Sequence, residues 1–249
     1  MDMIDYMPKI VGFSPILDEI ECIEGWFKNI SSFCHEVWAI YDPRSTDGTT
    51  EWLKKKAEET KNAKVPLKLF EQNITQGDST RYERGRRDEI VYLWEINRFL
   101  HEKVPEGNWC VWLAADERIN VAQRDQVFAA LNQAEAMQAD CLVFDLYDMY
   151  PDEGHRVGYE YVEGLVLTHK KFFRRNANVH FGTRAHDGES GMYHPLRTGI
   201  PFFHFGYVKQ TKQECWWRNW DGLNLVKKLP QEKAYIPFTN PIKDWRHEA

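Results

Sequence analysis

Apolar and amphipathic segments alternate regularly along the first 140 residues. Short apolar runs bounded by turn residues predict four buried strands. The predicted strands span 9–16, 36–42, 65–72 and 109–116. Between them, apolar residues recur at spacings of three and four, which predicts amphipathic helices. These helices span 18–34, 49–60, 86–103 and 122–137. The order indicates a mostly parallel, Rossmann-like sheet in a three-layer α/β/α arrangement.

The pattern changes after Asp140, where apolar residues alternate with polar ones in segments joined by Gly-, Asp- and Asn-rich turns. Such alternation predicts added antiparallel strands. These strands span 140–150, 164–175, 179–183 and 200–207. A last amphipathic segment, 212–228, predicts a C-terminal helix that closes the fold. No linker or repeat divides the chain, so we expect one domain over 1–249 with halves of about 1–139 and 140–249.

Composition narrows the class of protein. Apolar residues make up 43% of the chain and charged residues 28%, as in ordinary soluble globular proteins. The net charge of −6 argues against a protein that coats nucleic acid, although it leaves room for a local basic groove. The 10 Trp, 11 Tyr and 14 Phe either fill a bulky core or form a site that stacks planar or sugar rings.

The cysteines and the hydrophobic pattern bear on the compartment. Five scattered cysteines without CxxC spacing predict reduced, mostly buried thiols in a cytosol-like compartment. The first residues lack a basic segment followed by an apolar one, so we expect no signal peptide. No apolar run approaches 18 residues, so we expect no transmembrane segment. Together these features favour a cytoplasmic protein.

Polar residues follow each of the first four predicted strands, and in open α/β sheets ligands bind at the carboxyl ends of strands. Asp42 ends the second strand, where it is either a loop residue or an acceptor for a ring N–H of a base. Asp47 is expected to cap the next helix. Asp116 and Glu117 follow the fourth strand, and Glu117 is expected to pair with Arg118 or a nearby backbone group.

Several segments resemble, in order, the family 2 glycosyltransferases, which are inverting enzymes of the GT-A fold. "VWAIYDPRSTDGTTEWL" is similar to the family's "vvDdgStDgT" segment, and "NWCVWLAADERIN" to its "dWvlwlDaDEri" segment. "KIVGFSPILDEIECIEGWFKNI" resembles its opening strand and helix. "FFRRNANVHFGTRAHDGES" and "FFHFGYV" resemble its later "lfrn…f.g.vHE" and "i.H.gy" segments.

The resemblance implies a UDP-sugar donor. It also implies a role in binding the nucleotide for several residues that match the family pattern. Asp42 would accept a hydrogen bond from the uracil imide N–H. Pro15 and Glu19 would lie near the base and ribose, with Asp18 a weaker match. Arg87 would lie along the diphosphate.

The resemblance also implies a metal and a catalytic base. Asp116 would hold a divalent cation, Mn²⁺ or Mg²⁺, that bridges the diphosphate and assists departure of UDP. His204 would complete the metal shell, or it is a satisfied core histidine. Asp187 matches the base that removes the acceptor hydroxyl proton, with His186 as the alternative.

Two positions depart from the family pattern. The first Asp of the metal motif is replaced by Ala114, which leaves activity expected but puts metal affinity and donor choice in question. Pro43-Arg44 stands where an acid and a small residue are usual, and Arg44 meets either the donor or solvent. The arginines of 80–87 form either a solvated helix start or a diphosphate-binding patch. The Trp residues of 215–220 line a closing helix or stack on a sugar.

The leading hypothesis is therefore a metal-assisted, inverting transferase that moves a sugar from a UDP-sugar to a hydroxyl group in a single displacement. A nucleotide-sugar-binding module without turnover is one alternative, motivated by Ala114. A metal-dependent hydrolase or nuclease that uses Asp116, Asp187 and His204 is another. The acceptor is a glycan, a protein or a modified nucleic-acid hydroxyl, and the sequence leaves the oligomeric state open.

Overall fold

Strands of the first half form a parallel sheet in the order β3-β2-β1-β4. They are β1 (Ile10–Ile16), β2 (Glu36–Tyr41), β3 (Leu67–Glu71) and β4 (Trp109–Trp112). The computed structural model describes residues 8–73, 89–149, 156–157, 168–181, 189–205 and 235–236. Every residue of β1 is buried, as expected for a central parallel strand covered on both faces.

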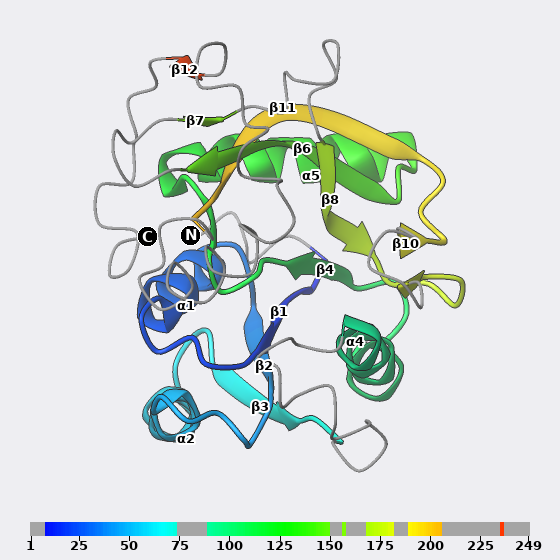
Figure 1. The fold of residues 1–249 in the computed structure, drawn as a ribbon. Helices are drawn as coiled ribbons and strands as arrows, with labels where there is room; N and C mark the ends of the chain where they lie inside the picture. Colours follow the sequence, from blue (N-terminus) through cyan, green and yellow to red (C-terminus); the bar gives the residue numbers. More distant parts are fainter. Residues whose placement is uncertain are drawn as a thin grey trace.

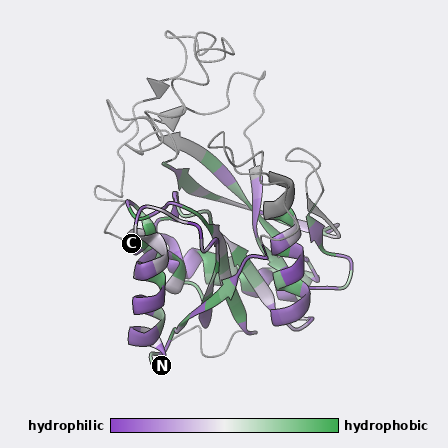
Figure 2. Cartoon of the chain, turned by 60° about the horizontal axis from the view of Figure 1, so that its bottom comes forward, coloured by the Kyte–Doolittle hydropathy of each residue, from purple (hydrophilic) through white to green (hydrophobic). Residues whose placement is uncertain are grey.

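Helices cover both faces of this sheet (Figure 1). Helices α1 (Ile23–Ser31), α2 (Thr49–Thr60) and α5 (Arg124–Met137) contribute to one buried cluster, and α4 (Glu89–Lys103) contributes to the other. Alternate residues of β1 enter the two clusters: Ile10 and Ile16 the first, Val11 and Phe13 the second. Figure 2 shows hydrophilic residues on the outer helix surfaces and hydrophobic ones toward the sheet.

Gly12 lets the first helical layer approach β1 closely. A Cβ at this position would lie 2.6 Å from Cys34 Sγ and 3.0 Å from Ile30 Cγ1. Both neighbours belong to the same fully buried cluster, so a larger residue at position 12 would require the layer to move. Cys22, Cys34, Cys110 and Cys141 are all free and buried, which confirms the predicted burial for the cysteines that the structure describes.

The second half extends the same sheet. β8 (Thr168–Arg174) pairs antiparallel with β4 and with β6 (Cys141–Met149), and β11 (Pro195–His204) lies parallel to β6. The short β5 (Glu117–Ile119) pairs antiparallel with β11. The remaining short elements are η3 (Val121–Gln123), β7 (Arg156–Val157), β9 (His180–Phe181), β10 (Glu189–Ser190) and β12 (Tyr235–Ile236). The prediction of an α/β protein with a mixed sheet is therefore confirmed.

Two predicted boundaries are wrong in ways that matter for the site. The helix predicted from residue 18 begins at Ile23, because Asp18 adopts a left-handed conformation (φ 50°) that interrupts helical geometry. The strand predicted over 109–116 ends at Trp112, and Glu117 starts β5 instead. The predicted C-terminal helix, 212–228, lies outside the described residues. None of the described helices combines the length and apolarity needed to cross a membrane.

Candidate functional site

Asp42 and Asp116 follow the two strands that flank β1, and both lie toward the carboxyl end of the parallel strands. β2 and β4 both run parallel to β1, so their carboxyl ends face one way (Figure 1). Asp42 directly follows β2, and its N–H donates to Ile16 O at the end of β1 (3.0 Å). Asp42 and Asp116 are only 1% and 5% exposed. Open α/β sheets bind ligands at this carboxyl end of their strands.

The Asp42 carboxylate is paired with Arg44. Its Nη2 donates to Asp42 Oδ2 (2.8 Å), and its Nε and backbone N–H donate to Oδ1 (3.0 and 2.9 Å). This two-pronged guanidinium–carboxylate contact is the strong, geometrically specific form of the pair. Arg44 was expected to meet the donor or solvent, but in the structure its guanidinium pairs with Asp42.

A set of hydrogen bonds joins the loop after β1 to the loop after β2. Asp47 Oδ2 accepts from Ile20 N (2.9 Å), and Asp18 Oδ1 accepts from Thr46 N (2.7 Å). Thr49 Oγ1 accepts from Glu19 N (2.8 Å). We call this set the loop latch. Because it ties backbone groups of each loop to side chains of the other, it holds 18–20 and 46–49 in one arrangement.

Asp47 also caps α2, as predicted. Its Oδ1 accepts from the backbone N–H and the hydroxyl of Thr49, the first helical residue (2.9 and 2.6 Å). Gly48, at the N-cap position, adopts φ 95°, a left-handed conformation that glycine reaches without steric cost. The Asp47-Gly48-Thr49 sequence thus builds the turn and the helix start together.

Pro15 and Glu19 lie next to the latch. Pro15 is buried in β1 beyond the last residue paired with β4, Phe13, so its missing N–H removes no hydrogen bond on that side. Glu19 is 5% exposed, and its Oε2 accepts from Cys22 Sγ (3.3 Å). The structure thus brings Pro15, Glu19 and Asp42 to one end of the sheet.

The turn that carries Asp116 is held by a buried ion pair. Lys171 Nζ lies 2.6 Å from Glu117 Oε2, and the same oxygen accepts from Ala114 N (2.8 Å). Burial by itself would raise the pKa of Glu117, but the Lys171 ammonium, His204 and these hydrogen bonds lower it overall. The expectation that Glu117 pairs with Arg118 or a nearby backbone group is confirmed through the backbone N–H of Ala114.

Arg118 lies beneath this turn, fully buried. Its guanidinium donates to Ala115 O (2.8 Å), Glu117 O (2.7 Å) and Cys22 O (2.8 Å). Burial lowers the pKa of Arg118 to about 10, although the negative groups around it, including Asp116 and Glu19, act in the opposite direction. The side chain therefore ties the Asp116 turn to the loop that contains Glu19.

His204 lies beside Asp116. β11 pairs with β5 so that His204 stands opposite Glu117, and Phe205 N donates to Asp116 O (2.8 Å). His204 Nε2 lies 3.8 Å from Asp116 Oδ2. A carboxylate oxygen and an imidazole nitrogen are suitable donors for Mn²⁺. No group of three potential ligands occurs in the part of the chain that the structure describes.

Other predicted site residues fall outside the described residues. They are Arg87, His186 and Asp187. The Arg-rich segment 80–87 and the Trp-rich segment 215–220 fall outside as well. Among the described residues, Pro15, Glu19 and Asp42 form one group at the carboxyl end of the parallel strands, and Asp116 and His204 form another.

Sequence reasoning missed Lys171. The register of β8 against β6 shifts between Phe172 and Lys170, so Lys171 lies at an irregularity in the pairing of these two strands. Its ammonium lies over the rings of Phe202 (4.6 Å to the centroid) and Trp112 (5.6 Å). The available signal was a pair of adjacent lysines, Lys170 and Lys171, within a strand. Strand alternation alone does not reveal which of them a register shift turns inward.

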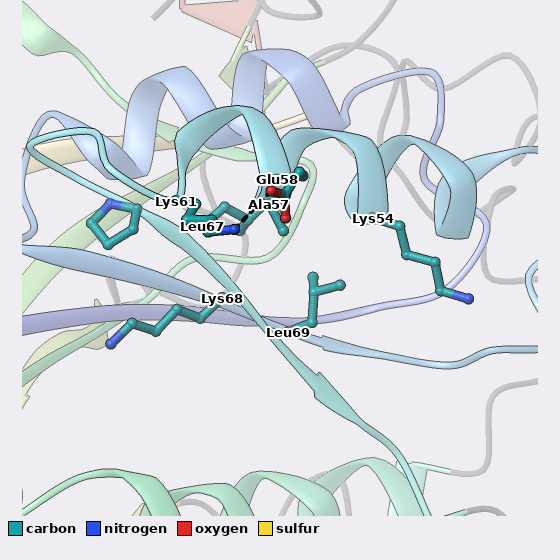
Figure 3. A pocket seen from close by; sticks show the side chains of 8 residues that line it. Lys54, Ala57, Glu58, Lys61, Leu67, Lys68 and Leu69 are labelled. Carbon is teal, nitrogen blue, oxygen red and sulfur yellow. Dashed lines mark hydrogen bonds and ion pairs between the residues drawn. The ribbon is translucent and has the colours of Figure 1, made fainter.

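A separate groove of about 480 Å³ lies between α2 and β3. It is lined by Lys54, Ala57, Glu58, Lys61, Pro66, Leu67, Lys68 and Leu69 (Figure 3). Two of its three lysines are already paired, Lys61 with Glu58 (2.9 Å) and Lys68 with Glu36 (2.7 Å). The groove contains none of the predicted site residues, and these pairs reduce its attraction for an anionic ligand.

Comparison with protein-family models and with curated proteins found no match to this chain.

Proposed function

We propose that this chain is an inverting glycosyltransferase of the GT-A fold. It would move a sugar from a UDP-sugar to the hydroxyl group of a glycan, a protein or a modified nucleic acid. The observation that carries the proposal is the convergence of two buried carboxylates, Asp42 and Asp116, at the carboxyl edge of a parallel sheet. We also propose a cytoplasmic location.

The loop of residues 17–22 connects the two carboxylates. The loop latch joins it to the segment after Asp42, and Arg118 joins it to the turn that carries Asp116. Trp26, at the start of α1, adds a hydrogen bond from Nε1 to Leu113 O (3.0 Å). A site braced in this way suits an extended ligand with a base at one end and a diphosphate at the other, because its polar groups are preorganised.

In this mechanism, each residue binds the donor, orients a reacting group or transfers a proton. Asp42 accepts the imide N–H of the base, with Pro15 and Glu19 beside it. Asp116 and His204 would hold the divalent cation, which when bound offsets the negative charge that develops on the departing UDP. On the family resemblance alone, Asp187 removes the proton of the acceptor hydroxyl on the face opposite the leaving group, with His186 as the alternative base.

A nucleotide-sugar-binding module without turnover is the second candidate. Ala114 favours it, because the carboxylate expected there is missing and the Ala114 N–H is tied to Glu117 instead. Such a module would bind UDP through the same loops and release no free sugar or UDP. The two candidates differ only in turnover, so one pair of measurements separates them.

The test is incubation of the full chain with a panel of nucleotide sugars, Mn²⁺ and candidate acceptors, with release of UDP as the readout. We expect release from at least one UDP-sugar, and no release from that donor by Asp116→Ala. UDP binding measured by calorimetry without any release would select the binding module. Absence of both binding and release across the panel would contradict the proposal.

A further inference from the structure

The carboxylate assigned to base recognition is already engaged. Within the described part of the chain, the Asp42 carboxylate accepts three hydrogen bonds, all from Arg44, and two of them fill the acceptor sites of Oδ1. With the guanidinium in place, the Asp42 residue is only 1% exposed. A nucleobase therefore has no open route to Oδ1 or Oδ2 in this arrangement.

The backbone holds Arg44 in position while its side chain keeps room to move. Asp42 O accepts from Ser45 N (3.2 Å), and the loop latch fixes Thr46 and Asp47 just beyond. The Arg44 side chain is 37% exposed, whereas its carboxylate partner is 1% exposed. Rotation of the guanidinium toward solvent would therefore uncover Asp42 without a change in the backbone.

We propose that Arg44 is a specificity-determining residue that competes with the nucleobase for the carboxylate of Asp42. This inference rests on the proposed function, because it assumes that a base binds there. When a base binds, its N–H replaces the guanidinium donors at the Asp42 carboxylate. A base without an N–H at that position therefore gains no hydrogen bond to Asp42. Arg44 thereby lowers affinity for bases that donate an N–H at that position, whereas the affinity of a base without such an N–H does not depend on this exchange.

Uridine and 3-methyluridine test this exchange directly. Neither nucleoside carries a phosphate, so the loss of the Arg44 charge does not act on the ligand through a phosphate group. The variants are Arg44→Ala, which removes the competitor, and Arg44→Lys, which keeps the charge but loses the two-pronged contact. Arg197→Ala is the matched control, because Arg197 pairs with Asp145 on the β6–β11 surface (3.3 Å).

We expect calorimetry to give uridine binding that is about threefold to tenfold tighter in Arg44→Ala than in the native chain. Arg44→Lys should fall between the two, and Arg197→Ala should match the native chain. Binding of 3-methyluridine should stay weak in all of them. In NMR spectra, the Arg44 Nε–H resonance, identified by its loss in Arg44→Lys, should shift when uridine saturates the native chain.

Two results would overturn the inference in different ways. Uridine binding that is unchanged or weaker in Arg44→Ala, or equal gains for 3-methyluridine, would show that Arg44 does not compete for Asp42 and would leave the proposed function standing. No binding of uridine or UDP by any variant would contradict the proposed function, and the inference with it.

Discussion

The two sides of the candidate site are built differently, although each has a buried carboxylate. On the Asp42 side, the carboxylate is covered by a sequence neighbour, Arg44, two residues away, and the loop latch joins 18–20 to 46–49 across 27 to 30 positions. On the Asp116 side, the supporting groups come from distant strands, Lys171 on β8 and His204 on β11. The Asp42 carboxylate therefore pairs with a residue close in the chain, whereas Asp116 and its neighbour Glu117 meet residues that only tertiary packing brings to them.

Exposure of the supporting groups also differs. The Arg44 side chain is 37% exposed, while Lys171 is 5% exposed and Arg118 is fully buried. Water can replace a lost partner on the first side, whereas on the second a lost partner leaves a buried charge unpaired. Loss of a supporting group should therefore lower the free energy of unfolding more on the Asp116 side than on the Asp42 side.

The largest effect is expected from Lys171→Met. It leaves Glu117 buried without its cation, so the free energy of unfolding should fall by about 3–5 kcal/mol in urea denaturation. Adding Glu117→Gln should restore part of the loss, because the buried charge is then gone. Lys170→Met, at the adjacent half-buried position in β8, is the control and should shift stability by less than about 0.5 kcal/mol. Equal effects at both lysines would contradict the comparison.

Asp116→Asn should affect turnover rather than folding. The change keeps the side-chain shape but removes the charge, so Mn²⁺-dependent UDP release should fall about 100-fold or more, a loss of about 2.7 kcal/mol. Uridine binding at Asp42 should be retained. Asp145→Asn, a carboxylate outside the candidate site, serves as the control for initial rates. Unchanged turnover in Asp116→Asn would remove Asp116 from the proposed mechanism.

Asp47→Ala should loosen the latch at modest cost. It removes acceptors for Ile20 N and for the first helical N–H of α2, and we expect a loss of about 1 kcal/mol in the free energy of unfolding. Asp47→Asn retains an acceptor oxygen and should lose less. A larger loss from Asp47→Ala than from Lys171→Met would reverse the proposed contrast between the two sides.

The smallest effect concerns acid stability in the first half. Burial would raise the pKa of Glu36, but hydrogen bonds from Lys68, Trp38 and Lys9 lower it to about 2. A lowered folded-state pKa means that this stabilisation is complete above pH 4.5 and is lost as the pH falls toward 2. We expect about 1 kcal/mol, because both lysines are exposed to screening water. Unfolding measured against pH should have a shallower slope in Glu36→Gln over this range.

Local patterns were sufficient for much of the first half. The apolar runs at 9–16, 36–42 and 65–72 correspond to β1, β2 and β3, because central strands need apolar residues on both faces. The Asp47 cap was predictable for a similar reason, since its partner Thr49 lies two residues away. The start of α1 was not, because the positive φ of Asp18 accompanies hydrogen bonds to residues almost thirty positions away.

Local patterns thus account for what could be predicted from the residues themselves: the alternation of strands and helices in the first half, the helix cap, and two carboxylates that follow strands. Tertiary structure decided which charges meet those carboxylates. The division of one apolar segment into β4 and β5, the register shift that turns Lys171 inward, and the contact between Arg44 and Asp42 all depend on three-dimensional packing and geometry. Periodicity specifies which face a residue occupies, but the register of distant strands and the rotamer of a side chain determine its partner.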